Sequence, residues 1–251
     1  LVINGWSVPT ALLVAFAAGL VAGFVTGFLH TVLGIPDILA GILSQIALYS
    51  INLNIMGMAN QALSVDKYNL LVSLREVQKS ILVSVIFAFV IICILYWYFG
   101  TEQGCALRAT GCNPNMAKAQ GINVDFMKIL ALALSNGLVA LAGGLIAQYQ
   151  GFADINMGRG AIVIGLAAVI IGEVLGEALL AKHLNFMGRL IFVVIGGIIY
   201  YIVVGIVLWL KMPTNDLKLF TAIIVAIFLA VPYLRAKSRN SFAKAAKKGA
   251  E

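Results

Sequence analysis

Long apolar runs alternate with short polar stretches along the whole chain, and this alternation predicts a set of membrane-spanning helices. A helix needs about 20 apolar residues to cross a bilayer, and runs such as Ile81–Phe99 reach that length. We count seven such segments: Val8–Leu33, Ile38–Met58, Ser80–Phe99, Phe126–Gln148, Ala161–Leu180, Leu190–Leu210 and Leu217–Tyr233. The pattern predicts an all-α, polytopic membrane protein with about seven transmembrane helices.

Composition supports this interpretation and limits what the positive charge means. Hydrophobic residues make up 62% of the chain and charged residues 11%, whereas about 25% of a soluble domain is charged. The net charge is +7, and six of the seventeen Lys and Arg residues lie in the last seventeen positions. A basic cluster beside a final span favours a topology anchor near anionic lipid over a nucleic-acid site. We therefore expect a transmembrane domain over residues 1–234, a basic cytoplasmic tail over residues 235–251 and no nucleic-acid partner.

The distribution of basic residues predicts the orientation of the chain. If the tail is cytoplasmic, eleven Lys and Arg residues lie on that side and six on the other, as the positive-inside rule requires. The chain then starts outside, with the apolar sequence Leu-Val-Ile. We expect an upstream span before it, which gives at least eight spans in a bacterial cytoplasmic (inner) membrane.

Small residues recur at four-residue intervals in the first span, at Gly19, Gly23 and Gly27. Such a row lets a second helix approach backbone to backbone. We interpret it as helix packing, either within one chain or between two chains.

The second span carries three polar side chains on one face, at Gln45, Tyr49 and Asn52. Spacings of four and three residues place them in line along a helix. Polar groups at membrane depth must face protein or water. They are candidates for lining a translocation path, and the alternative is hydrogen bonding between neighbouring helices.

A short capped helix is predicted between the third and fourth spans. Asn113 is a good N-cap, Pro114 suits the first helical position, and Gly121 suits a left-handed helix end. These signals bracket about seven residues, Pro114–Gln120. A helix that short needs support from its own spans or from a partner.

We expect Gly111 and Gly121 to permit the two sharp turns of this segment, and Ala117 to sit in the groove of a partner. The alternative is an ordinary turn with good capping. Asn123 is expected to cap the span that follows.

Residues 111–123, read as Gly-Cys-Asn-Pro-Asn-Met-Ala-Lys-Ala-Gln-Gly-Ile-Asn, are followed by the Gly/Ala-rich residues 134–145. This pattern resembles the permeases of binding-protein-dependent ABC importers of the branched-chain amino acid and ribose type. Residues 35–43 and 158–173 share the similarity, which spans most of the chain. Within the superfamily, the chain is most similar to permeases labelled as tryptophan or tyrosine systems.

The resemblance implies a role for the short helix. In the family, this loop is the coupling segment that docks on the ATPase subunit, and Gly111, Asn113, Ala117 and Gly121 match its motif. The family also implies an ATP-binding cassette subunit, an extracytoplasmic solute-binding protein and a second permease chain. Gly172-Glu173 stands where sugar permeases have Gly-Gly, so an amino acid or related small solute is favoured.

Two other classes compete with a permease. The chain has no Walker-type loop, so it does not hydrolyse ATP by itself. An ion-coupled carrier usually places ionisable residues inside the membrane, and the apolar runs here hold few. An intramembrane enzyme needs a nucleophile with a base, or a metal cluster, and no such motif is present. We expect no enzyme activity, no cofactor and no metal.

Six other charged or titratable positions are weaker candidates. Glu173 and Glu177 lie four apart and are interpreted as a solvated helix end paired with Lys182 or Arg189, with a gate or a contact to the ATPase subunit as the alternative. Asp154 and Arg159 flank an external loop that could meet the binding protein. His30 and His183 are each interpreted as isolated packing or surface residues.

The orientation is directly testable. A reporter enzyme that works only in the cytoplasm should be active when it is fused after Lys248, because the basic tail holds that end of the chain inside. Activity of a reporter that works only outside the cell would overturn the predicted topology.

Overall fold

The computed structural model describes residue 2 and residues 5–63, 70–158, 161–180 and 185–209, together with residues 223 and 226. The elements found in these ranges are α1 (Val8–Thr31), α2 (Asp37–Met56), β1 (Asn60–Ala62), α3 (Val77–Phe99), α4 (Glu102–Cys112), α5 (Pro114–Ala119), α6 (Val124–Gln150), β2 (Phe152–Asp154), α7 (Ala161–Leu180) and α8 (Phe186–Trp209). The all-α class is confirmed.

Five of the described helices are long and apolar enough to cross a membrane: α1, α2, α3, α6 and residues Phe186–Ile206 of α8. The helix predicted over Leu217–Tyr233 and the basic tail fall outside the described residues, except for residues 223 and 226. The count of seven spans stays a prediction. The chain divides into two compact units, Leu1–Gly158 and Arg159–Glu251, and each is described by itself.

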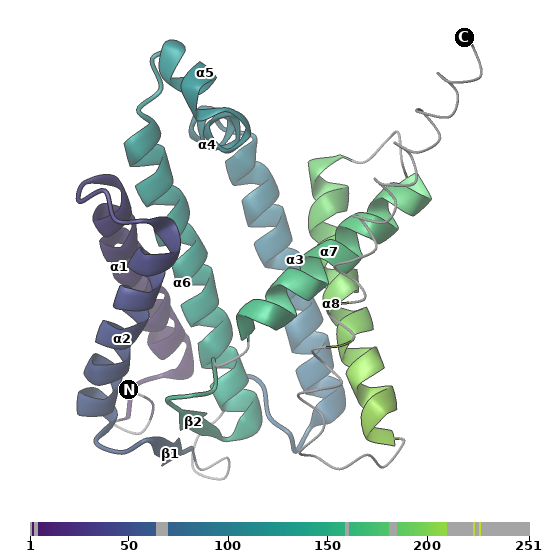
Figure 1. Ribbon diagram of the computed structural model, residues 1–251. Helices are drawn as coiled ribbons and strands as arrows, with labels where there is room; N and C mark the ends of the chain where they lie inside the picture. Colours follow the sequence, from purple (N-terminus) through teal and green to yellow (C-terminus); the bar gives the residue numbers. More distant parts are fainter. Residues whose placement is uncertain are drawn as a thin grey trace. The chain divides into compact units, whose positions relative to one another are not determined.

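The first unit is built around direct contact between the backbones of α1 and α6 (Figure 1). A Cβ atom added at Gly19 would lie 2.6 Å from the Asn136 carbonyl oxygen, and one at Gly27 would lie 2.8 Å from Ile129 Cα. At Gly23 an added Cβ would collide with the backbone of Leu132. The structure thus places the predicted glycine row inside a single chain, against α6.

Glycines on α6 receive side chains from α1 in return. A Cβ atom at Gly137 would lie 2.9 Å from Phe16 Cε2, and one at Gly144 would lie 2.9 Å from Leu12 Cδ2. Apolar side chains of α1 therefore fill the spaces that α6 leaves open. Shape complementarity of this kind drives helix association in a bilayer, where apolar surface alone gives no preference for another helix over lipid.

Helix α2 is attached to α1 through a narrow contact. Thr26 Oγ1 donates to Ser44 Oγ over 2.8 Å, and Ser44 Oγ in turn donates to the Ala40 carbonyl over 3.0 Å. Ala40 and Ser44 are the buried residues of this helix in the described part of the chain. In the described part of the chain, most other side chains of α2 are exposed.

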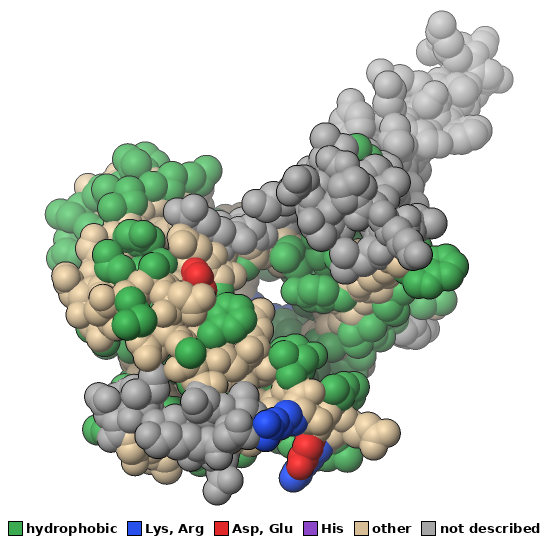
Figure 2. All heavy atoms as spheres, turned by 90° about the horizontal axis from the view of Figure 1, so that it is seen from below, with side chains coloured by type: hydrophobic (Ala, Val, Ile, Leu, Met, Phe, Trp, Pro, Cys, Tyr) green, Lys and Arg blue, Asp and Glu red, His purple; other side chains and the backbone are tan. Residues whose placement is uncertain are grey.

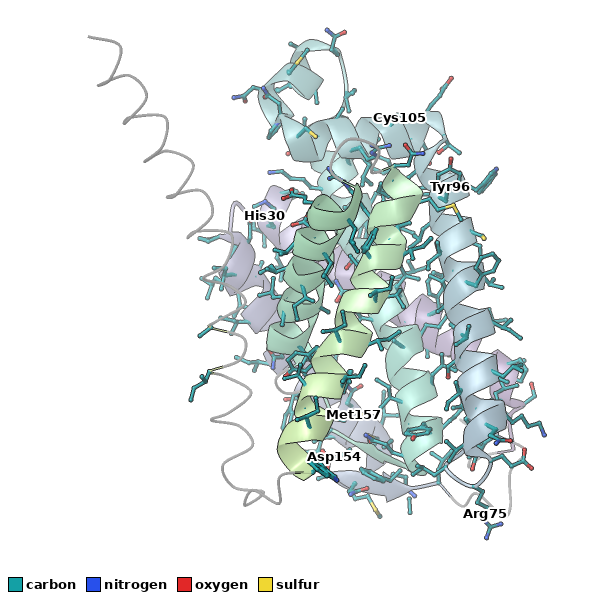
Figure 3. All side chains as sticks on the ribbon, turned by 90° about the vertical axis from the view of Figure 1, so that its right-hand side faces the viewer. His30, Arg75, Tyr96, Cys105, Asp154 and Met157 are labelled. Carbon is teal, nitrogen blue, oxygen red and sulfur yellow. The ribbon has the colours of Figure 1, made fainter. Side chains whose placement is uncertain are left out.

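At one end of the unit, β1 and β2 form an antiparallel two-stranded sheet that the sequence did not predict (Figure 1). The Leu63 N–H extends the pairing by donating to the Gly151 carbonyl over 2.8 Å. We call this end, which also holds Arg75 and Asp154 (Figure 3), the sheet end. Charged side chains are sparse on the described part of this face (Figure 2).

The segment before α3 differs from expectation. Over Val65–Lys79, apolar residues mixed with Lys67, Arg75, Glu76 and Lys79 predict a helix lying at the membrane interface. The described residues 70–76 instead form bends and turns, and α3 begins at Val77. Ser80 fixes this approach, because its Oγ donates to the Ser73 carbonyl over 2.6 Å and accepts from the Ser73 N–H over 2.8 Å. Hydrogen bonds from the Ser80 side chain thus take the place of the backbone hydrogen bonds of the predicted helix.

The second unit repeats the close approach with a different pair of helices. A Cβ atom at Gly172 of α7 would lie 2.9 Å from Val193 Cα, and one at Gly196 of α8 would lie 2.7 Å from the Gly172 nitrogen. Ala167, Ile171 and Tyr200 form a buried cluster beside this crossing. The backbones of α7 and α8 therefore touch where both helices lack side chains.

The α1–α6 contact generates a stability prediction with a matched control. Gly23→Ala should destabilise the protein by about 1–3 kcal/mol, the usual cost of overpacking, because the new methyl group meets the α6 backbone. Gly41→Ala in α2 is the control, since an added Cβ there meets nothing within 4 Å. Thermal unfolding in detergent should show a lower midpoint for Gly23→Ala only; equal midpoints would show that the row carries no packing energy.

Candidate functional site

A helical hairpin made of α4 and α5 connects the spans α3 and α6. Thr101 is the N-cap of α4, and its side-chain oxygen accepts from the Gly104 N–H over 3.3 Å. The chain turns tightly here, because a Cβ atom at Gly104 would lie 2.9 Å from the Phe99 carbonyl carbon. Helix α4 was missed in the sequence, although Thr101 followed by Glu102 is a recognisable helix start.

The capping signals of α5 are confirmed. Asn113 is extended (φ −154°, ψ 98°), and its Oδ1 accepts from the Met116 N–H over 3.1 Å. Gly121 has φ 79°, the left-handed conformation expected after the helix. Asn123 then caps α6, because its Oδ1 accepts from the Phe126 N–H over 3.1 Å.

Two expectations about this segment are corrected by the structure. Gly111 lies inside α4 and does not have a positive φ, so the first turn is made by the extended Asn113 instead. Ala117 is only 2% exposed, so its side chain is enclosed by its own chain and does not reach a partner. Met116, which is 63% exposed, is the large apolar side chain that α5 presents outward.

A pocket of about 350 Å³ lies between α5 and the start of α6. It is lined by Pro114, Asn115, Lys118, Ile122, Asn123, Val124 and Asp125. Lys118 and Asp125 bring opposite charges to its wall. The pocket therefore offers polar contacts beside the exposed face of the hairpin.

The three polar candidates of α2 lie away from the contact with α1. Gln45, Tyr49 and Asn52 are all exposed, and Tyr49 is 42% exposed. At about 100° per residue, they lie roughly 80–140° around the helix from Ser44, which faces α1. They share one uncovered face of α2, and the structure does not bring them to the hairpin.

His30 is not isolated, contrary to expectation. Its Nδ1 lies 2.7 Å from Asp37 Oδ1 and 2.9 Å from the Ile35 carbonyl oxygen, and its Nε2 lies 3.4 Å from Lys128 Nζ. It stands at the same end of the unit as Cys105 of α4 (Figure 3), which we call the hairpin end. The sequence signal was present, because Asp37 follows seven residues later at the start of α2.

The remaining candidates are only partly described. Glu173 and Glu177 have exposed side chains on α7, whereas Lys182 and His183 lie outside the described residues. Asp154 ends β2, where its Oδ1 accepts from the Asn156 N–H over 2.6 Å. Its predicted companion Arg159 is also outside the described residues.

Apolar spans, two of them joined by a capped helical hairpin, define a multi-pass membrane protein. Residues 1–232 match the family described as the permease component of branched-chain amino acid transport systems. The chain belongs to this family. It is therefore a membrane-embedded transport component of the ABC importer class and not an enzyme.

Two curated relatives cover most of the chain. It is 38% identical over 243 residues to the tyrosine transport system permease protein of Clostridioides difficile (strain R20291), covering 96% of this chain and 79% of that protein. It is 34% identical over 224 residues to an uncharacterized protein of Rickettsia prowazekii (strain Madrid E), covering 88% and 78%. No solved structure gives a significant match.

The polar face of α2 can be tested by thiol labelling. A cysteine at position 49, in a chain whose native cysteines are replaced, should react with a water-soluble maleimide because this face is uncovered and polar. Ser44→Cys is the control on the same helix, since Ser44 is 8% exposed and faces α1. If Tyr49→Cys fails to react in every nucleotide state, its face packs against protein or lipid and does not line a path.

Proposed function

We propose that this chain forms half of an amino-acid uptake pore in the bacterial cytoplasmic membrane. It works with an ATP-binding cassette subunit, an extracytoplasmic solute-binding protein and a second permease chain. The observation that carries the proposal is the α4–α5 hairpin, a rigid element joined directly to two spans in a chain that belongs to a permease family. The hairpin end is then cytoplasmic and the sheet end external, in agreement with the distribution of basic residues.

The hairpin is suited to transmitting force from a partner. Its helices begin at the side-chain caps Thr101 and Asn113, and a third cap at Asn123 starts α6 without a flexible linker. A displacement of α5 is therefore transmitted directly to α6, and to α3 through α4. Coupling between two sites requires such an element with a defined position in each state.

The outward face of the hairpin supports docking of a protein. Met116 is a flexible, polarisable side chain of the kind common at protein-binding surfaces, and it is exposed on an otherwise polar segment. The pocket between α5 and the start of α6, with Lys118 and Asp125 in its wall, provides sites for charged or amide side chains of the same partner. This face replaces Ala117 as the proposed contact.

The uncovered surfaces of α2 and α3 support a second permease chain. Among the described residues, Ala40 and Ser44 are the buried positions of α2 and Ser80 is that of α3. For α2 the exposed surface includes Gln45, Tyr49 and Asn52, and polar groups at membrane depth need protein or water beside them. A pore at the junction of two chains satisfies this requirement.

An amino-acid solute is supported by the relative that is named a tyrosine transport permease. The proposed path offers amide and phenol groups, which can exchange hydrogen bonds with a zwitterion without binding it tightly. None of these three side chains carries a full charge. The path is thus suited to passing a solute that the binding protein has already selected.

Replacing Met116 by Glu should release the ATPase subunit or uncouple hydrolysis from uptake, because a carboxylate would have to be desolvated in the contact. Met58→Glu is the matched control, since Met58 is 54% exposed but lies beyond the other end of α2. The measurements are retention of the ATPase on the affinity-purified permease and uptake by reconstituted vesicles.

The expected result is loss of the ATPase, or of uptake, with Met116→Glu and full retention of the ATPase with Met58→Glu. The thermal unfolding midpoint of both variants should equal that of the parent. Normal retention and normal uptake with Met116→Glu would show that the hairpin is not the docking element.

A further inference from the structure

Three helices meet at a small charged cluster at the hairpin end, and no role has yet been given to it. His30 lies in the last turn of α1, Asp37 is the first residue of α2, and Lys128 lies in the second turn of α6. The imidazole stands between the other two side chains. We call these three residues the His30 node.

The contacts determine which nitrogen of the imidazole carries the proton. A Lys ammonium group has donors and no acceptor, so Nε2, at 3.4 Å from Lys128 Nζ, must be the accepting nitrogen. Nδ1 then carries the hydrogen, and both atoms close to it, Asp37 Oδ1 and the Ile35 carbonyl oxygen, are acceptors. With this hydrogen shared between the two acceptors, the imidazole connects Lys128 on α6 to Asp37 on α2.

The His30 node lies between the hairpin and α2. Lys128 follows Asn123, the cap that joins the hairpin to α6, by five residues. Beside it, Ile129 touches the backbone of α1 at Gly27, so α6 and α1 are held together at this level. Helix α2 is attached to α1 through Thr26 and Ser44, and a Cβ atom added at Gly41 of α2 would meet nothing within 4 Å.

The strength of the contacts suits a connection that is made and broken. The Asp37 side chain is 80% exposed, whereas that of His30 is 19% exposed. Exposed ion pairs contribute little to folding, so the node is not needed to hold the bundle together. It joins the start of α2 to α6 through the imidazole.

We propose that His30 is a positioning residue that transmits movement of the α5–α6 segment to α2, the helix that carries Gln45, Tyr49 and Asn52. The inference rests on the proposed function, because it assumes an ATPase subunit acting on the hairpin. Movement of α6 changes the distance from Lys128 to the imidazole, and the imidazole passes the change to Asp37 through Nδ1–H. The node thereby links nucleotide state to the conformation of the path.

The test uses the full chain assembled with its ATPase subunit in vesicles. His30→Leu removes both contacts, Lys128→Met removes one, and His30→Asn keeps an amide near the Nδ1 position facing Asp37. Thr10→Val is the control, because it removes an exposed side-chain bond to Ser7 at the start of the same helix. The measured quantity is solute taken up per ATP hydrolysed.

The expected result for His30→Leu and Lys128→Met is a fall of about fivefold or more in this ratio, the lower end of typical coupling. The double variant should be no worse than either single variant, because both interrupt one connection. His30→Asn should fall between the parent and His30→Leu, and Thr10→Val should equal the parent. The ATPase should remain bound in every variant.

A second readout separates this inference from the proposed function. Maleimide labelling of a cysteine at position 49 should change between nucleotide-free and ATP-bound states in the parent and lose that change in His30→Leu. If His30→Leu keeps both the labelling change and the uptake ratio, or loses only thermal stability, the inference is overturned while the proposed function stands. A parent chain that binds no ATPase subunit overturns both.

Discussion

The missing side chains at Gly19, Gly23 and Gly27 are the constraint on which the first unit depends. Inside a bilayer, apolar surface gives helices no reason to prefer each other over lipid, so association relies on close packing. The glycines bring the backbone of α1 onto that of α6, and Gly137 and Gly144 accept the side chains of α1 in return. The second unit uses the same solution at Gly172 and Gly196. Within the described residues, both units thus contain a tightly packed pair of helices.

Other helices of the first unit are held by polar contacts that can be exchanged. Helix α2 is attached through Thr26, Ser44 and the His30 node, and α3 through its approach at Ser80 and its junction with α4. A transporter needs parts that keep their shape and parts that change place, and packed interfaces tend to switch between discrete arrangements. The distribution of backbone and side-chain contacts separates these two kinds of part.

Local signals were readable in the sequence, and long-range ones were not. The caps at Asn113, Asn123 and Gly121 act over a few residues, so their positions followed from the letters alone. The pairing of β1 with β2 joins segments about ninety residues apart, and Lys128 meets His30 across 98 residues. The local sequence around each of these residues does not indicate which distant residue it contacts. The burial of Ala117 was missed for the same reason, because it depends on how the hairpin folds back.

The small sheet has a mechanical consequence for α2. Pairing of Asn60 with Asp154 ties the chain just after α2 to the end of α6, so the far end of α2 is a pivot. Any displacement at Asp37 then becomes a tilt about that pivot, and its amplitude grows with distance from it. Gln45 is seven residues farther from the pivot than Asn52, about 10 Å along the helix. Among the three polar residues of α2, Gln45 would therefore move farthest, so the width of the proposed path would change most near it.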